Sequence, residues 1–171
     1  LPFKSDIVHT ADFYINIGKQ LLESGMRIDS ICLKDASGTT DPKTIYDTVI
    51  GLKKIMPPEM PLWLHTQDTA STAVACYIAG IDAGVDGVDL SVRPMASGTV
   101  QPDVRSLAHG LKGTGYSLDI NVSKMDEIEN TMSAYRELKT AEVFMSIDGT
   151  LHIIGDQRNP IMRVIPNNGG D

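Results

Sequence analysis

The sequence predicts an α/β fold built around a parallel sheet, and three observations carry this prediction. Short apolar runs begin at Ile31, Leu62 and Gly87, which lie 31 and 25 residues apart. Each run is too short for a helix and opens into a polar loop, as a buried parallel strand does. Stretches with helical spacing separate the runs, which suits successive βα units. Because a (β/α)8 barrel usually needs about 250 residues, the 171 residues predict about half of such a barrel or, alternatively, an open flavodoxin-like sheet.

Apolar stripes and end signals define the expected helices. The first covers Asp12–Ser24 and stops at Gly25, and the second starts at Pro42 after the N-cap residue Asp41. A third helix, rich in small residues, closes at Gly84. The later expectations are helices from Pro102 to about Lys112 and over Met125–Lys139, a third strand over Gly87–Val92, and strands over Leu151–Ile154 and Met162–Ile165.

Composition limits the classes of function. A net charge of −7 and a pI near 5.0 argue against nucleic acid and anionic membranes as partners, because the long-range field repels polyanions. No apolar run reaches the roughly 18 residues of a membrane span, so we expect no membrane insertion. The two cysteines, Cys32 and Cys76, both lie within apolar runs, which favours free thiols in a reducing, cytoplasmic compartment. The start at Leu1 rather than Met hints at a fragment or a processed chain.

Charged and hydrogen-bonding side chains follow the first two strands directly. Lys34 and Asp35 end the first apolar run, and His65 begins the polar segment after the second. The carboxyl ends of parallel strands are where functional groups gather in α/β proteins. Taken alone, Lys34 would most often be a solvated lysine and His65 a structural histidine.

Five linked segments carry a resemblance to a known family. They are Leu33–Gly38 (LKDASG), Leu64–Thr69 (LHTQDT), Ala79–Asp86 (AGIDAGVD), Met95–Pro102 (MASGTVQP) and Leu111–Gly115 (LKGTG). In order and spacing they resemble the carboxyltransferase domain of biotin-dependent enzymes, namely the pyruvate carboxylase B subunit, the oxaloacetate decarboxylase α subunit and the transcarboxylase 5S subunit. The resemblance implies the second half of a TIM barrel, strands five to eight, over residues 1–140. Residues 141–171 would then hold the last strand region and the start of a C-terminal extension.

The resemblance also implies a metal site and its chemistry. In the family a carboxylated lysine and both histidines of a His-x-His motif bind a divalent metal, and Lys34 and His65 occupy two of these positions. Gln67 replaces the second histidine, which is a departure, because an amide oxygen suits harder ions better than zinc. Asp35 is expected to orient the site from behind the ligands. The family's first-strand aspartate has no counterpart here, and Thr150 is the residue considered for its proton-shuttling threonine.

The implied function is carboxyl transfer to, or decarboxylation of, a 2-oxo acid of the pyruvate/oxaloacetate pair, with Lys34 as the catalytic residue. The implied cofactors are Zn, Mn or Co and carboxybiotin. The biotin would be carried by a partner protein or domain, because no Ala-Met-Lys-Met acceptor motif occurs in the chain. We also expect a homo-oligomer. Two alternatives stay open: an aldol-type metallolyase of the hydroxymethylglutaryl-CoA lyase kind, and a non-catalytic half-barrel with an architectural role.

Overall fold

The computed structural model describes residues 9–134, 151–156 and 159–166. The chain divides into two compact units. One unit comprises Leu1–Ser91 and Ala96–Val122, and the other comprises Val92–Met95 and Ser123–Asp171. The first unit holds the parallel sheet, and each unit is described by itself.

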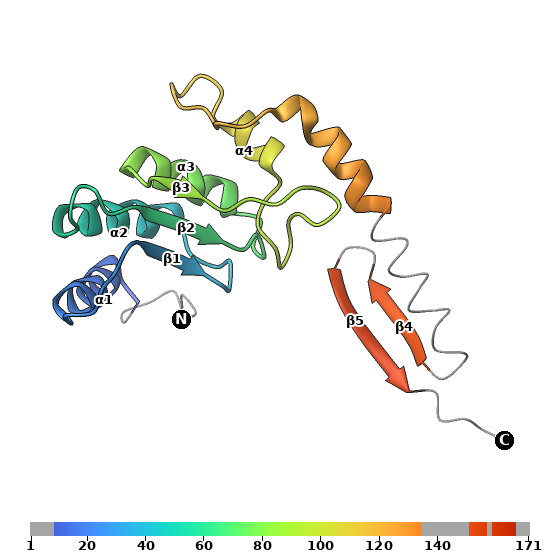
Figure 1. Cartoon of the computed structure of the whole chain (residues 1–171), viewed down its shortest axis with the longest axis horizontal. Coiled ribbons are helices and arrows are strands. Elements are labelled where there is room, and N and C mark those ends of the chain that lie inside the picture. Colours follow the sequence, from blue (N-terminus) through green and yellow to red (C-terminus); the bar gives the residue numbers. More distant parts are fainter. Residues whose placement is uncertain (1–8, 135–150, 157–158, 167–171) are drawn as a thin grey trace. The chain divides into compact units, whose positions relative to one another are not determined.

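A parallel sheet in the order β1-β2-β3 organises the first unit (Figure 1). It consists of β1 (Ile31–Asp35), β2 (Leu62–Thr66) and the short β3 (Gly87–Val88). β1 pairs with β2 along its whole length, whereas β3 pairs only with the middle of β2. The first two strands therefore lie where the apolar runs predicted them.

Among the described residues, four helices accompany the sheet: α1 (Ala11–Glu23), α2 (Pro42–Ile55), α3 (Ala73–Ala83) and α4 (Val104–Gly110). Consecutive helices pack against one another, and α3 also packs against β2. The predicted end signals are confirmed at α2, where the Asp41 carboxylate accepts a hydrogen bond from the backbone N–H of Thr44 at 2.9 Å. They are confirmed again at α3, which ends at Gly84 in the left-handed conformation.

Burial alternates along β2 and separates the two faces of the sheet. Leu62, Leu64 and Thr66 are almost completely buried, while Trp63 is 41% exposed. The buried face packs against helices: a Cβ atom at Gly80 of α3 would lie 2.7 Å from a methyl carbon of Leu64. The main core therefore lies between the sheet and the helices, as the cluster of buried apolar residues indicates, which includes Tyr14, Ile45, Val49, Leu52, Leu62, Leu64, Cys76, Tyr77 and Leu107.

In the second unit, β4 (Leu151–Asp156) pairs antiparallel with β5 (Asn159–Pro166). A 3-10 turn, η1 (Val122–Lys124), leads into a helix that is described over residues 125–134. The two predicted C-terminal strands are thus confirmed. The rest of the helix expected to reach Lys139, the predicted domain boundary at residue 140 and Thr150 fall within 135–150, outside the described residues.

Two expectations about the strands are corrected. The third strand ends at Val88 rather than Val92, because Ser91 instead forms an isolated bridge with Asp103, where its N–H bonds to the carbonyl of Pro102. The strands are also not buried on both faces, since Cys32 and Trp63 are exposed on the side opposite the helices. The described residues contain three parallel strands, and the four-strand half-barrel stays a prediction. Within the described residues no helix is long and apolar enough to cross a membrane.

Candidate functional site

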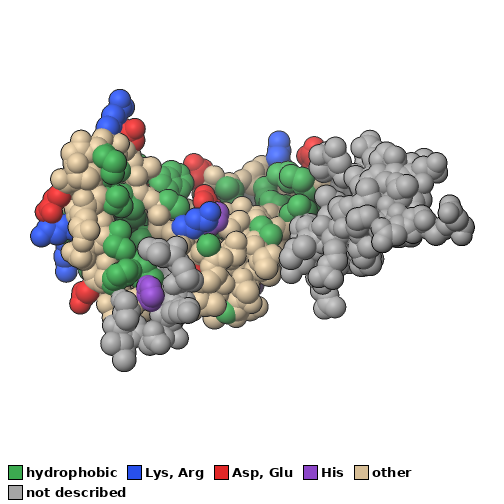
Figure 2. Space-filling view, turned by 90° about the horizontal axis from the view of Figure 1, so that it is seen from below, with side chains coloured by type: hydrophobic (Ala, Val, Ile, Leu, Met, Phe, Trp, Pro, Cys, Tyr) green, Lys and Arg blue, Asp and Glu red, His purple; other side chains and the backbone are tan. Residues whose placement is uncertain are grey.

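Lys34 and His65 lie side by side at the carboxyl ends of β1 and β2. They are direct partners in the parallel register. Both belong to the face opposite the helices, because side chains alternate along a strand and their neighbours Leu33, Leu64 and Thr66 are turned toward the other side. The side chain of Lys34 is exposed and makes no hydrogen bond or ion pair within the described ranges of the chain. Figure 2 shows a histidine, a basic and an acidic side chain gathered on one face of the molecule.

Both ring nitrogens of His65 have partners. Nδ1 lies 2.7 Å from Oδ2 of Asp89, and Nε2 lies 2.8 Å from the amide nitrogen of Gln101. The imidazole is about a quarter exposed, at 23%, and the Asp89 side chain is half exposed. The ring is therefore oriented from both sides but stays open to solvent.

Asp35 does not reach the ligand positions, which corrects the expectation that it would orient them. Its buried carboxylate accepts hydrogen bonds from the Ser37 hydroxyl at 2.9 Å and from the backbone N–H groups of Gly38 at 2.9 Å and Thr40 at 3.2 Å. The physical reason is strand alternation, which turns Asp35 to the face opposite Lys34. Asp35 therefore shapes the loop after β1.

Gln67 extends the line of β2 beyond its last residue. Its backbone N–H donates to the carbonyl of Asp35 at 3.0 Å, so the parallel pairing continues one step past the strand. Alternation then puts Gln67 on the same face as His65. Gly38 packs against it with φ +62°, and a Cβ atom there would lie 2.4 Å from the Gln67 carbonyl oxygen, so only glycine fits.

Tyr77 of α3 ties the ends of β2 and β3 together. Its buried hydroxyl accepts from the N–H of Thr66 at 2.9 Å and donates to the carbonyl of Asp89 at 2.6 Å. The Asp89 N–H also donates to the carbonyl of Leu64 at 3.0 Å. Asp89 is thereby fixed beside His65, although it lies just beyond the strand.

The sequence did not assign Asp89, Gln101 or Tyr77 to the site. Asp89 lies within Gly87–Val92, which was expected to be a strand, and Gln101 was noted only as part of the segment MASGTVQP. The carboxylate of Asp68, near the end of β2, accepts from the N–H of Ala73, the first residue of α3, at 3.2 Å. A usable signal existed for Asp89: it is the first carboxylate after the third strand, just as Lys34 and His65 lie near the carboxyl ends of the first two.

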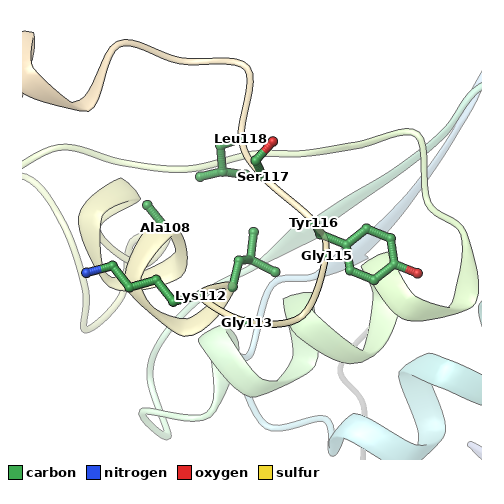
Figure 3. Close-up of a pocket in the computed structure, with 8 residues that line it drawn as sticks. Ala108, Lys112, Gly113, Gly115, Tyr116, Ser117 and Leu118 are labelled. Carbon is green, nitrogen blue, oxygen red and sulfur yellow. The ribbon is translucent and has the colours of Figure 1, made fainter.

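A surface cavity lies away from these residues, in the loop that follows α4 (Figure 3). Its volume is about 440 Å³. It is lined by Ala108, Leu111, Lys112, Gly113, Gly115, Tyr116, Ser117 and Leu118. None of the predicted site residues contributes to it.

The donor groups on the open face fit a divalent metal only if Lys34 changes its chemistry. Across the described part of the chain, no three His, Cys, Asp or Glu side chains lie close enough to hold a metal ion. His65 has the environment of a ligand, because histidine ligands usually give their other N–H to a carboxylate, as Asp89 permits here. Lys34 could join as a carbamate and Gln67 through its amide oxygen. That set of donors is compatible with the implied metal.

Comparison with known proteins identifies the family. The family model described as HMGL-like matches residues 5–132. The chain belongs to the HMGL-like family. Among curated relatives, it is 37% identical over 130 residues to the B subunit of pyruvate carboxylase from Methanocaldococcus jannaschii, covering 76% of this chain and 22% of that protein. It is 31% identical over 129 residues to the methylmalonyl-CoA carboxyltransferase 5S subunit of Propionibacterium freudenreichii subsp. shermanii, covering 75% and 25%.

Solved structures show the same relationship. The carboxyl transferase domain of Rhizobium etli pyruvate carboxylase, solved with pyruvate, matches this HMGL-like chain with a TM-score of 0.69 and 25% identity, over 80% of this chain and 23% of that one. The same domain solved with pyruvate and biocytin matches equally well, with a TM-score of 0.69. The resemblance to biotin-dependent carboxyltransferases is therefore confirmed, as is an α/β fold of their TIM-barrel type. The chain spans about a quarter or less of the length of these relatives.

Proposed function

We propose that this protein takes part in biotin-dependent carboxyl transfer to or from a 2-oxo acid, with pyruvate and oxaloacetate as the substrate pair. One observation carries the proposal: Lys34 and His65 are register partners on one sheet face, in a chain similar to carboxyltransferases. A domain solved with pyruvate and biocytin is among the similar structures, which supports the substrate class and a biotin-bearing partner.

The described sheet supports the finer proposal of a second half-barrel. β1, β2 and β3 would correspond to strands five to seven, and residues 1–140 would form the partial barrel, with residues 141–171 leading into an extension. The open sheet face, and the edges of β1 and β3 that have no strand partner among the described residues, would then be covered by the first half of the barrel. Such a chain on its own exposes strand edges and apolar side chains such as Trp63, which favours self-association and suits a homo-oligomer.

Lys34 is the residue for which we propose a covalent change. Its neutral amine attacks CO2, a nitrogen–carbon bond forms, and the nitrogen loses a proton to solvent. The product is an anionic carbamate in place of a cation. The exposure of Lys34 and its lack of an ion-pair partner within the described ranges support this step, because no salt bridge has to be broken first.

The carbamate oxygens, Nε2 of His65 and the Gln67 amide oxygen would hold the divalent ion. When bound, such an ion polarises the carbonyl of the 2-oxo acid and stabilises negative charge on its oxygen. Two of these three donors are oxygen atoms, and Gln67 is neutral. This set suits Mn²⁺, because carboxylate-type and carbonyl oxygens are ligands that harder divalent ions accept.

Partners and location follow from the same proposal. The carboxyl group would be carried as carboxybiotin on a separate carrier protein or domain. Cys32 and Cys76 are free thiols, one exposed and one buried. Free thiols support a cytoplasmic location, because oxidising compartments favour disulfides.

The carbamate is tested by NMR in buffer containing ¹³C-bicarbonate. A carbamate carbon signal should be present in the wild-type chain and absent in Lys34→Met. Lys54→Met is the matched control, because Lys54 is an exposed lysine in the last turn of α2. Loss of the signal in Lys54→Met, or its persistence in Lys34→Met, would contradict the assignment to Lys34.

Activity is tested with the full-length protein and its biotin carrier, by following oxaloacetate decarboxylation. Removing a group that stabilises developing charge costs about 100-fold or more, so Lys34→Met should lower kcat by at least that factor while Lys54→Met stays active. An unchanged rate in Lys34→Met would exclude the proposed mechanism.

Aldol-type cleavage is a second candidate, favoured by one observation, the HMGL-like description of the matching family model. It predicts turnover of an acyl-CoA substrate without any biotin carrier. Carrier-dependent turnover of oxaloacetate would exclude it, and the absence of both activities would favour the architectural alternative.

A further inference from the structure

The hydrogen bonds of His65 define which ring nitrogen carries its proton. A carboxylate can only accept, so Nδ1, at 2.7 Å from Asp89, must be protonated. In the neutral ring, Nε2 then keeps its lone pair and accepts a hydrogen bond from the Gln101 amide at 2.8 Å. The nitrogen that could bind a metal ion therefore already has a partner in this structure.

Gln101 is held at this position by the backbone around it. The carbonyl of Gln101 accepts from the N–H of Ser97 at 2.8 Å, and the neighbouring Val100 carbonyl accepts from the N–H of Asp68 at 2.9 Å. The next residue, Pro102, is buried. These contacts anchor the segment on the loop that follows β2, whereas the Gln101 side chain is only partly buried. The amide can therefore turn away while its backbone stays in place.

We propose that Gln101 competes with the metal ion for Nε2 of His65, so that metal binding requires the Gln101 amide to leave, while Asp89 stays bound to Nδ1 and positions the ring. This inference rests on the proposed metal-assisted function and adds two residues to it: Asp89, which positions the His65 ring, and Gln101, which competes with the metal ion. Asp89 favours the tautomer in which the lone pair of Nε2 is available to a metal ion, and Gln101 lowers the metal affinity. The segment carrying Gln101 would thereby respond to whether the site is loaded.

The first test uses the metal-free full chain and no activity measurement. Long-range ¹H–¹⁵N spectra of the imidazole rings distinguish the two neutral forms, and the signals of the four histidines are assigned by single His→Gln variants. The wild-type His65 should be protonated at Nδ1. In Asp89→Asn this preference should weaken, because an amide can donate as well as accept, while the exposed Asp82→Asn control should leave it unchanged. A wild-type ring protonated only at Nε2 would overturn the proposal.

The second test measures Mn²⁺ affinity in bicarbonate buffer, with paramagnetic broadening of the His65 signals as proof of the site. Gln101→Met keeps the side-chain volume but cannot donate. Because one net hydrogen bond no longer has to be broken, Mn²⁺ should bind roughly twofold to tenfold more tightly. Asp89→Asn should bind about tenfold to 100-fold more weakly. Gln20→Met, an exposed glutamine on α1, is the matched control and should bind like wild type.

The possible outcomes separate this inference from the proposed function. An unchanged or weaker Mn²⁺ affinity in Gln101→Met overturns the competition, and so does the absence of His65 broadening in both wild type and Gln101→Met. If the affinities change as expected but no carboxyl transfer is found with the carrier present, the proposed function fails and the competition stands.

Discussion

On the helix-covered face of the β1-β2-β3 sheet, Leu62 and Leu64 are completely buried, whereas on the opposite face Trp63 is 41% exposed and Lys34 lies open to solvent. The same five-residue strand supplies both faces of β2. Side-chain alternation thus separates two tasks: one face contributes packing energy, and the other presents polar groups. A substitution at an even-numbered position of β2, on the covered face, should therefore lower stability. A substitution at an odd-numbered position, on the open face, should mainly affect the chemistry.

The largest expected effect comes from deleting packing on the covered face. Leu64→Ala should lower the free energy of unfolding by about 2–5 kcal/mol, because its side chain fills the space against Gly80 of α3. Urea unfolding followed by circular dichroism measures this loss. The matched variant on the open face is Trp63→Ala, which should cost less than half as much although it removes a larger side chain. An equal or larger cost for Trp63→Ala would show that the open face also contributes to the core.

A smaller effect is expected where the two faces are joined. Tyr77→Phe removes the hydroxyl that bonds the Thr66 N–H and the Asp89 carbonyl. The buried Thr66 N–H would lose its partner, so unfolding should be easier by about 1–3 kcal/mol. Tyr46→Phe on α2, where the tyrosine is 38% exposed, should change stability by no more than about 0.5 kcal/mol. Similar values for the two variants would mean that the Tyr77 hydroxyl contributes nothing to stability.

The Tyr77 variant also sharpens the comparison on the open face. Because the Tyr77 hydroxyl donates to the backbone carbonyl of Asp89, removing this hydroxyl should weaken the hydrogen bond between the Asp89 carboxylate and His65, although neither side chain is changed. The ¹H–¹⁵N spectra of the His65 ring would detect this as a reduced preference for the Nδ1-protonated form. An unchanged preference would show that the N–H···O bond from Asp89 to Leu64 is enough to fix Asp89.

Sequence patterns predicted the covered face better than the open one. Apolar runs and end residues such as Asp41 and Gly84 act locally, so they can be recognised directly in the sequence. The polar residues at the ends of the first two apolar runs also identified Lys34 and His65, which are register partners in the structure. Which residues then bond to His65 depends on tertiary contacts. Asp89 acts from 24 positions away and Gln101 from 36 positions away, and only Asp89 had a usable signal, its place directly after the third strand.

The exposure of the open face could not be predicted for a related reason. An apolar run specifies a strand, but it does not say whether a second layer covers the far side. Cys32 and Trp63 fit a strand buried on both faces as well as they fit this one-sided sheet. Asp35 illustrates the same limit. Its charge suggested a role beside the metal ligands, but side-chain alternation places its carboxylate on the opposite face, where it accepts hydrogen bonds from the loop after β1.

The smallest expected effect is a pH dependence that differs between the two cysteines. Burial, together with the charges of Asp35 and Asp41, raises the pKa of Cys76 to about 12. An unfolded cysteine loses its proton near pH 9, so above that pH the native state binds more protons and stability falls as pH rises. The loss should reach about 1.4 kcal/mol at pH 10, and Cys76→Ala should remove it from urea unfolding curves recorded between pH 8 and 10. The exposed Cys32 has a pKa raised mainly by partial burial, so Cys32→Ala should flatten the pH dependence less than Cys76→Ala does. A larger change in Cys32→Ala would show that Cys32, and not Cys76, causes the loss of stability above pH 9.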